Sequence, residues 1–145
     1  MGLPVREILK LGERRLTDSA CGNPKTDSEL LYCHLMNIDR GHLFMHWSDE
    51  LSDECCNTYF GLLDSRTSGA PLQYITGKQS FMGIDFAVDE NVLIPRQETE
   101  MLVEAVLETV KASKGKIKRV LDLCTGSGAI AVSLAALTRG LHVTA

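Results

Sequence analysis

The sequence predicts an α+β fold in three parts: a bundle of helices at residues 1–70, a β-hairpin linker at 71–95, and the beginning of a layered α/β domain at 96–145. Three observations support this division. Apolar residues recur at helical spacing up to Thr67, and the period then shortens to two. From Arg119 a strand, a glycine-rich turn and a helix follow one another.

The first part carries four helical segments. Pro4 suits the first turn of a helix whose pattern stops at Gly22. Thr26 or Asp27 is expected to cap a second helix ending near Asn37, and residues 41–47 form a short third. Ser52 begins a fourth, which residues 67–71 terminate. The polar residues of this bundle form no recognisable catalytic set, so we expect a packed or partner-binding module.

The linker alternates with a period of two at residues 73–76, 80–82 and 84–88, with Gly77 and Gly83 as turn positions. This pattern predicts a hairpin or two short ribbons, which Pro95 closes because the residue before proline avoids the helical region. A helix follows, with Glu98 and Glu100 in its first turn, where negative charge suits the helix dipole. It is expected to end at 113–115.

Bulk composition excludes several classes of protein. The net charge of −4 gives no basic footprint for nucleic acid, and no apolar run is long enough to span a membrane. The first twenty residues lack the apolar core of a signal peptide, so a cytoplasmic location is expected. Five cysteines without C-x-x-C spacing favour reduced thiols over disulfides or a zinc cage. No metal site is expected, because His42 and His46 have no third ligand nearby.

The glycine-rich turn carries the chemistry. Gly126 and Gly128 allow a sharp turn from strand to helix and let a cofactor approach the backbone closely. The free N–H groups at the helix start add hydrogen-bond donors. Two cofactor classes remain, a dinucleotide such as NAD and S-adenosylmethionine. Asp122 favours S-adenosylmethionine, since a carboxylate suits its cationic methionine portion and would repel a pyrophosphate. The alternative is that Asp122 only accepts backbone hydrogen bonds within the turn.

Several motifs together resemble the HemK-type protein-glutamine N5-methyltransferases, which modify the glutamine of the Gly-Gly-Gln motif in peptide chain release factors. The matching segments are Pro71-Leu72-Gln73-Tyr74-Ile75-Thr76-Gly77, then Phe81 and Gly83, then Leu93-Ile94-Pro95-Arg96-Gln97-Glu98-Thr99-Glu100, and Asp122 to Ile130. The resemblance implies a helical substrate-recognition domain, a hairpin linker and a Rossmann-like S-adenosylmethionine-dependent methyltransferase domain.

The resemblance also implies which residues hold the cofactor S-adenosyl-L-methionine. Cys124, Thr125, Gly126, Ser127 and Gly128 would line the methyl-donor pocket through backbone contacts, beside Asp122. Arg96, Glu98 and Thr99 would lie near its edge, although helix capping and first-turn electrostatics explain them equally well. Phe81 would shield the pocket, or serve simply as a hairpin core residue. Cys124 stands where many relatives have glycine.

The groups expected to act on the substrate amide are not in the sequence. An acidic residue that holds the ribose is expected roughly 20 positions beyond the turn, and the Asn-Pro-Pro-Tyr motif of the resembled family is also absent. We therefore expect the 145 residues to be the N-terminal portion of a longer enzyme, inactive alone, with catalytic residues after Ala145. The alternatives are another S-adenosylmethionine-dependent N-methyltransferase, an NAD-linked enzyme on the same fold, or a non-catalytic partner-binding fragment.

Overall fold

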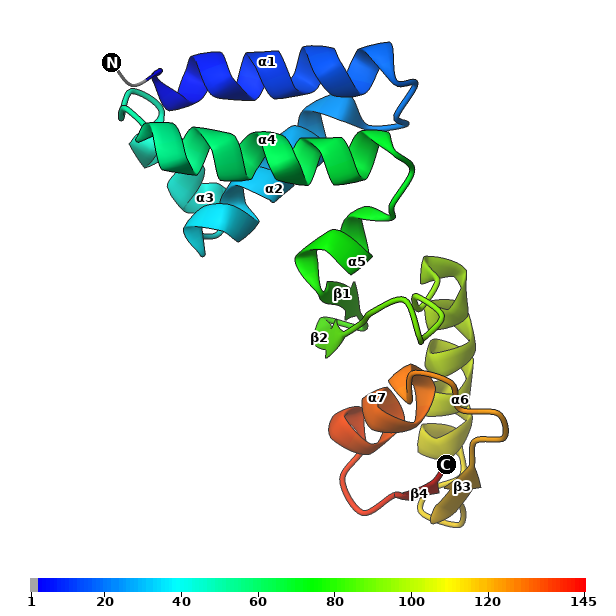
Figure 1. Ribbon diagram of the computed structural model, residues 1–145. Coiled ribbons are helices and arrows are strands. Elements are labelled where there is room, and N and C mark those ends of the chain that lie inside the picture. Colours follow the sequence, from blue (N-terminus) through cyan, green and yellow to red (C-terminus); the bar gives the residue numbers. More distant parts are fainter. Residues whose placement is uncertain (1–2) are drawn as a thin grey trace. The chain divides into compact units, whose positions relative to one another are not determined.

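The computed structural model describes residues 3–145 and divides the chain between Thr76 and Gly77 into two compact units. The elements that the structure describes within residues 3–76 are all helices or helical turns (Figure 1). The first unit contains α1 (Val5–Asp18), α2 (Pro24–Met36), α3 (Arg40–Leu43), the 3-10 turn η1 (Phe44–His46), α4 (Asp53–Thr67) and α5 (Leu72–Thr76). The prediction of a helical first part is therefore confirmed.

The second unit mixes strands and helices. Its elements are β1 (Lys78–Phe81), β2 (Ile84–Ala87), the 3-10 turn η2 (Gln97–Thr99), α6 (Glu100–Ala112), β3 (Arg119–Leu121), α7 (Ala129–Leu137) and β4 (His142–Thr144). Strands β1 and β2 form an antiparallel hairpin, and β3 and β4 form a separate parallel pair (Figure 1). The predicted α+β class is confirmed. Between Leu3 and Ala145, none of the helices combines the length and the apolar character that crossing a membrane demands.

Two local predictions are wrong. Helix α2 begins at Pro24, with Asn23 in the N-cap position, so Thr26 and Asp27 lie inside its first turn and do not cap it. Proline is favoured there because the first helical N–H has no intrahelical partner in any case. Residues 73–76, predicted to be extended, belong to helix α5. Leu72 and Ile75, three residues apart, both pack on the first unit's core, and this packing outweighs the extended pattern.

The core of the first unit is apolar except for three consecutive side chains of α2. Val5, Ile8 and Leu16 of α1 are fully buried, as their helical spacing predicts. Asp27, Ser28 and Glu29 are also buried, at 6%, 1% and 4% exposure, and each has a partner on another element. Buried polar groups are costly unless they are hydrogen-bonded, so these three fix how α2 sits against its neighbours.

The partners of this buried layer come from three helices, α1, α3 and α4. Asp27 accepts a 2.8 Å hydrogen bond from Arg66 Nε, and Glu29 accepts one of 2.7 Å from Arg40 Nε. Ser28 Oγ donates to the backbone oxygen of Leu9 at 2.9 Å and lies 2.7 Å from the Tyr59 hydroxyl. Arg66 also donates to the oxygen of Ala70, beyond the end of α4. Helices α1, α2 and α4 are thereby tied together by directional contacts as well as by apolar packing.

Gly12 leaves room for the Ser28–Tyr59 contact. A Cβ at this position would lie 2.2 Å from the Tyr59 hydroxyl and 2.7 Å from Ser28 Oγ. We expect Gly12→Ala to destabilise the first unit by about 2 kcal/mol through overpacking and loss of the buried hydrogen bond. Gly61→Ala, also within a helix but with nothing near its Cβ, is the control and should stabilise by about 0.5–1 kcal/mol. Urea unfolding followed by the fluorescence of the single tryptophan, Trp47, measures both. Equal effects of the two changes would contradict the steric argument.

The stability of the first unit should also fall at high pH. Burial raises the pKa of Tyr59 to about 12, against a smaller lowering by its hydrogen bond with Ser28. Because the folded pKa lies above the unfolded value of about 10, the stabilisation is complete below pH 10 and is lost as pH rises toward 12. We expect Tyr59→Phe to be less stable at pH 8 and to lose less stability between about pH 10 and 12. Urea unfolding at several pH values tests this, and identical pH profiles would contradict it.

Candidate functional site

The parallel pair of strands frames the predicted cofactor turn. Arg119 pairs with His142, Val120 with Val143 and Leu121 with Thr144, and α7 connects the two strands. The backbone N–H of Asp122 donates to the oxygen of Thr144 at 2.8 Å, which extends the ladder by one bond. The residues between β3 and α7 therefore emerge at the carboxyl end of a parallel sheet, where ligands bind in open α/β folds.

The backbone of the turn is left-handed at three positions. Cys124, Gly126 and Gly128 have φ angles of 60°, 57° and 76°. Gly128 N donates to the oxygen of Thr125 at 3.0 Å, and Gly128 occupies the N-cap position of α7 without a side-chain cap. A carbon placed on Gly126 or Gly128 meets no atom closer than 3.8 Å, so both are required for their φ and for open space. The turn thus presents uncovered backbone and the N–H groups of a helix start.

Asp122 is half-buried and hydrogen-bonded within the turn. Its Oδ2 accepts from the hydroxyl of Thr125 at 2.8 Å. The alternative prediction is that Asp122 accepts backbone hydrogen bonds within the turn. The observed bond is similar, but its donor is the side-chain hydroxyl of Thr125. The bond engages only one carboxylate oxygen among the described residues, so the side chain can brace the turn and still present negative charge at the strand end.

The other predicted site residues lie on different elements. Arg96 precedes η2, Glu98 lies within it, and both are exposed, whereas half-buried Thr99 takes the N-cap position of α6 without a side-chain cap bond. Within residues 3–145 no hydrogen bond or ion pair joins these three to the turn. Ser127 is at the turn, with its Oγ 3.4 Å from Ala129 N. The structure therefore brings Asp122 and residues 124–128 together as one loop, and places Arg96, Glu98 and Thr99 on a separate segment.

Phe81 is a core residue of the second unit. It is 1% exposed and meets Phe86 edge-on, with ring centroids 6.2 Å apart. Its apolar cluster includes Val103 of α6 and Ala129, the first residue of α7. Phe81 therefore belongs to the same apolar core as the first residue of the helix that follows the glycine turn.

Sequence reasoning missed one contact near Phe81. The backbone N–H of Met82 donates to Glu100 Oε1 at 2.7 Å. Glu100 stands in the first turn of α6, where the sequence suggested only a favourable interaction with the helix dipole. Its spacing in the sequence carries no signal for a partner eighteen residues away.

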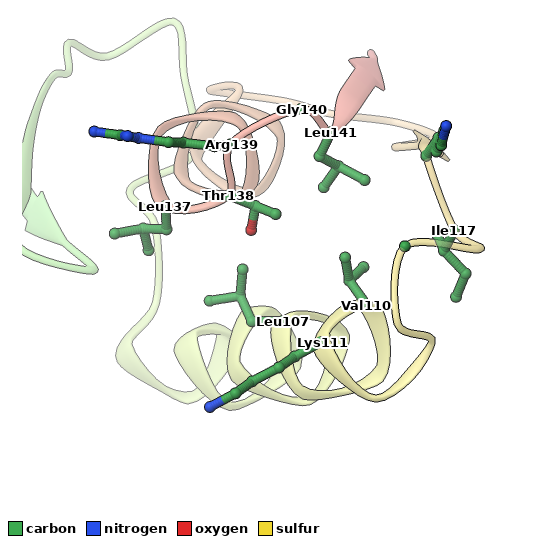
Figure 2. A pocket seen from close by; sticks show the side chains of 11 residues that line it. Leu107, Val110, Lys111, Ile117, Leu137, Thr138, Arg139, Gly140 and Leu141 are labelled. Atoms are coloured by element: carbon green, nitrogen blue, oxygen red, sulfur yellow. The ribbon is translucent and has the colours of Figure 1, made fainter.

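A cavity of about 580 Å³ lies at the other end of β3 and β4 (Figure 2). Its lining comes from α6, from the residues before β3 and from the residues before β4. In Figure 2, Leu107 and Val110 of α6 face Thr138 and Leu141, while Lys111 extends away from the space between them. The cavity is thus mainly apolar and separate from the glycine turn. The part of the chain that the structure describes holds no group of three or more His, Cys, Asp or Glu placed to bind a metal ion.

Comparison with known proteins agrees with the motifs. The family described as PrmC N-terminal domain matches residues 7–77. Release factor glutamine methyltransferases of Clostridium acetobutylicum and Moorella thermoacetica are 41% and 39% identical over 81% and 92% of this chain. The one of Koribacter versatilis is 45% identical over 85%. These matches cover 40%, 46% and 43% of the relatives, so the chain spans less than half of their length.

The left-handed conformation of Cys124 gives a test of the turn. A non-glycine residue at φ 60° is strained, and a β-branched one more so. We expect Cys124→Gly to stabilise the second unit by about 0.5–1 kcal/mol and Cys124→Val to destabilise it by about 1–2 kcal/mol. Hydrogen exchange of the α7 amides measures both changes. A stabilising valine would show that residue 124 is not left-handed in solution.

Proposed function

The chain belongs to the family of the release factor glutamine methyltransferases, and we propose that its protein transfers a methyl group from S-adenosylmethionine to a release factor. The acceptor in this proposal is the side-chain amide nitrogen of the glutamine in the Gly-Gly-Gln motif. The observation that carries the proposal is the family match at residues 7–77. The glycine turn after β3 supports it. We also propose that the protein is cytoplasmic and that its cysteines are reduced thiols.

The glycine turn is the proposed methyl-donor site. The bare backbone of Gly126 and Gly128 and the N–H groups at the start of α7 fit a ligand that approaches the chain closely. Asp122 would face the cationic methionine portion, with Thr125 holding its carboxylate in place. When bound, S-adenosylmethionine supplies an electrophilic methyl group. We propose that β3, α7 and β4 begin a Rossmann-like methyltransferase domain, because a parallel pair joined by a helix is its repeating unit.

The remaining predicted residues have supporting roles in the proposal. Arg96, Glu98 and Thr99 lie just before α6 and would form one edge of the donor site. Phe81 would support that site as a member of the apolar cluster that includes Ala129. The helical domain at residues 1–70 would recognise the protein substrate. Amide nitrogen is a poor nucleophile, so groups beyond those placed at the turn must orient it toward the methyl carbon.

Methyl transfer itself tests the proposal. The full-length protein is incubated with labelled S-adenosylmethionine and a release factor, and the modified peptide is located by mass spectrometry. Label on the Gly-Gly-Gln glutamine is expected. Label on another residue would redirect the proposal to a different N-methyltransferase, and no label with bound cofactor would favour a non-catalytic role.

Two glycines with matched backbone angles test the donor site. Gly128 and Gly140 have φ of 76° and 75°, so alanine should strain both equally. Gly128 lies at the proposed site, whereas Gly140 precedes β4 at the other end of the strands. We expect Gly128→Ala to weaken binding of S-adenosylmethionine in calorimetry by roughly tenfold or more, and Gly140→Ala to leave it within about threefold. Equal losses would show that stability, and not the turn, limits binding.

A further inference from the structure

The hairpin of the second unit closes through a two-residue turn that requires support. Phe81 pairs with Ile84, which leaves Met82 and Gly83 as the connecting residues, with φ of 51° and 73°. Two positive φ angles define the turn that matches the twist of a hairpin, and asparagine, aspartate or glycine usually fills its first position. Methionine is strained there. A contact from outside the hairpin would therefore help to hold this turn.

Glu100 supplies that support. Its Oε1 accepts the N–H of Met82 at 2.7 Å, a charge-assisted hydrogen bond in partly buried surroundings. The carboxylate also lies in the first turn of α6, where the helix dipole favours its negative charge. The bond joins the tip of the hairpin to the start of α6, eighteen residues further along the chain.

The residue next to this bond is Phe81. It is nearly fully buried and belongs to one apolar cluster with Val103 of α6 and with Ala129 and Leu134 of α7. Ala129 directly follows Gly128, the last residue of the proposed donor turn. Glu100 therefore bonds the residue that follows Phe81, and Phe81 shares an apolar cluster with the first residue after the glycine turn.

We propose that Glu100 is a positioning residue that sets the place of Phe81 and, through it, the base of the donor turn. This inference rests on the proposed function for its consequence in cofactor binding. It assigns Glu100 a role as a hydrogen-bond acceptor, beyond its favourable charge at a helix start. Glutamine at position 100 would keep the acceptor, and alanine would remove it.

The contact itself is tested in the 145-residue chain by NMR. In the unchanged protein the Met82 amide is expected to be protected from hydrogen exchange. Glu100→Ala should lower the protection by roughly tenfold or more, the loss expected for a hydrogen bond to a charged group. Glu100→Gln should keep most of the protection, because its side-chain oxygen still accepts. Glu104→Ala, which removes an exposed glutamate on the same helix, is the control and should leave the protection unchanged.

The consequence is tested by the position of Phe81 and by cofactor affinity. Nuclear Overhauser contacts between the Phe81 ring and its cluster should weaken in Glu100→Ala and persist in Glu100→Gln. Affinity of the full-length protein for S-adenosylhomocysteine should fall by roughly tenfold in Glu100→Ala and by less than about threefold in Glu100→Gln.

The outcomes separate the two proposals. Unchanged Phe81 contacts in Glu100→Ala, or an unchanged affinity despite loss of Met82 protection, would overturn the positioning role. If the unchanged protein binds no S-adenosylhomocysteine, the proposed function fails, and the Phe81 contacts alone decide whether Glu100 positions this side chain.

Discussion

The parallel pairing of β3 with β4 is the constraint on which the candidate site depends. Parallel neighbours need a crossover, and here the chain turns from the end of β3 into α7 within residues 122–128. That short reversal requires left-handed backbone at Cys124, Gly126 and Gly128. The two glycines leave the backbone without a Cβ at positions 126 and 128, just before the first N–H groups of α7. The backbone conformation on which the proposed cofactor site relies thus follows from the way the chain connects two parallel strands.

The two units use the hydrogen bonds of their polar side chains differently. In the first, Asp27, Ser28 and Glu29 all lie on α2, and each is matched by a residue of another element. Removing one partner would leave a buried group unsatisfied, so the layer fixes one packing of the helices. In the second unit the comparable bonds are local or involve backbone, as with Asp122 and Thr125 or Glu100 and Met82. These bonds shape turns more than they select a core.

Much of the fold could be predicted because its signals are local. The helical spacing of Val5, Ile8 and Leu9 and the capping bond of Ser52 to Cys55 N act within a few residues, as does the glycine turn. The burial of Asp27 could not be predicted, since its partner Arg66 is 39 residues away. Helix α5 was missed because Leu72 and Ile75 are held by the core and not by their own pattern.

The candidate site also separates into residues placed by a local motif and residues that lie elsewhere in the sequence. Asp122 and residues 124–128 are contiguous, so a local motif brought them together, whereas cofactor roles for Arg96, Glu98 and Thr99 stay predictions because no hydrogen bond or ion pair among the described residues connects them to the turn. The two-stranded β3–β4 sheet has a further property. Leu121 and Leu123 at its end are 61% and 75% exposed, and Lys118 and Arg119 stand at its beginning. Open strand edges can add strands from other molecules, and flanking like charges oppose this. Since salt screens such charges, their opposition to strand pairing between molecules is expected to weaken as ionic strength rises.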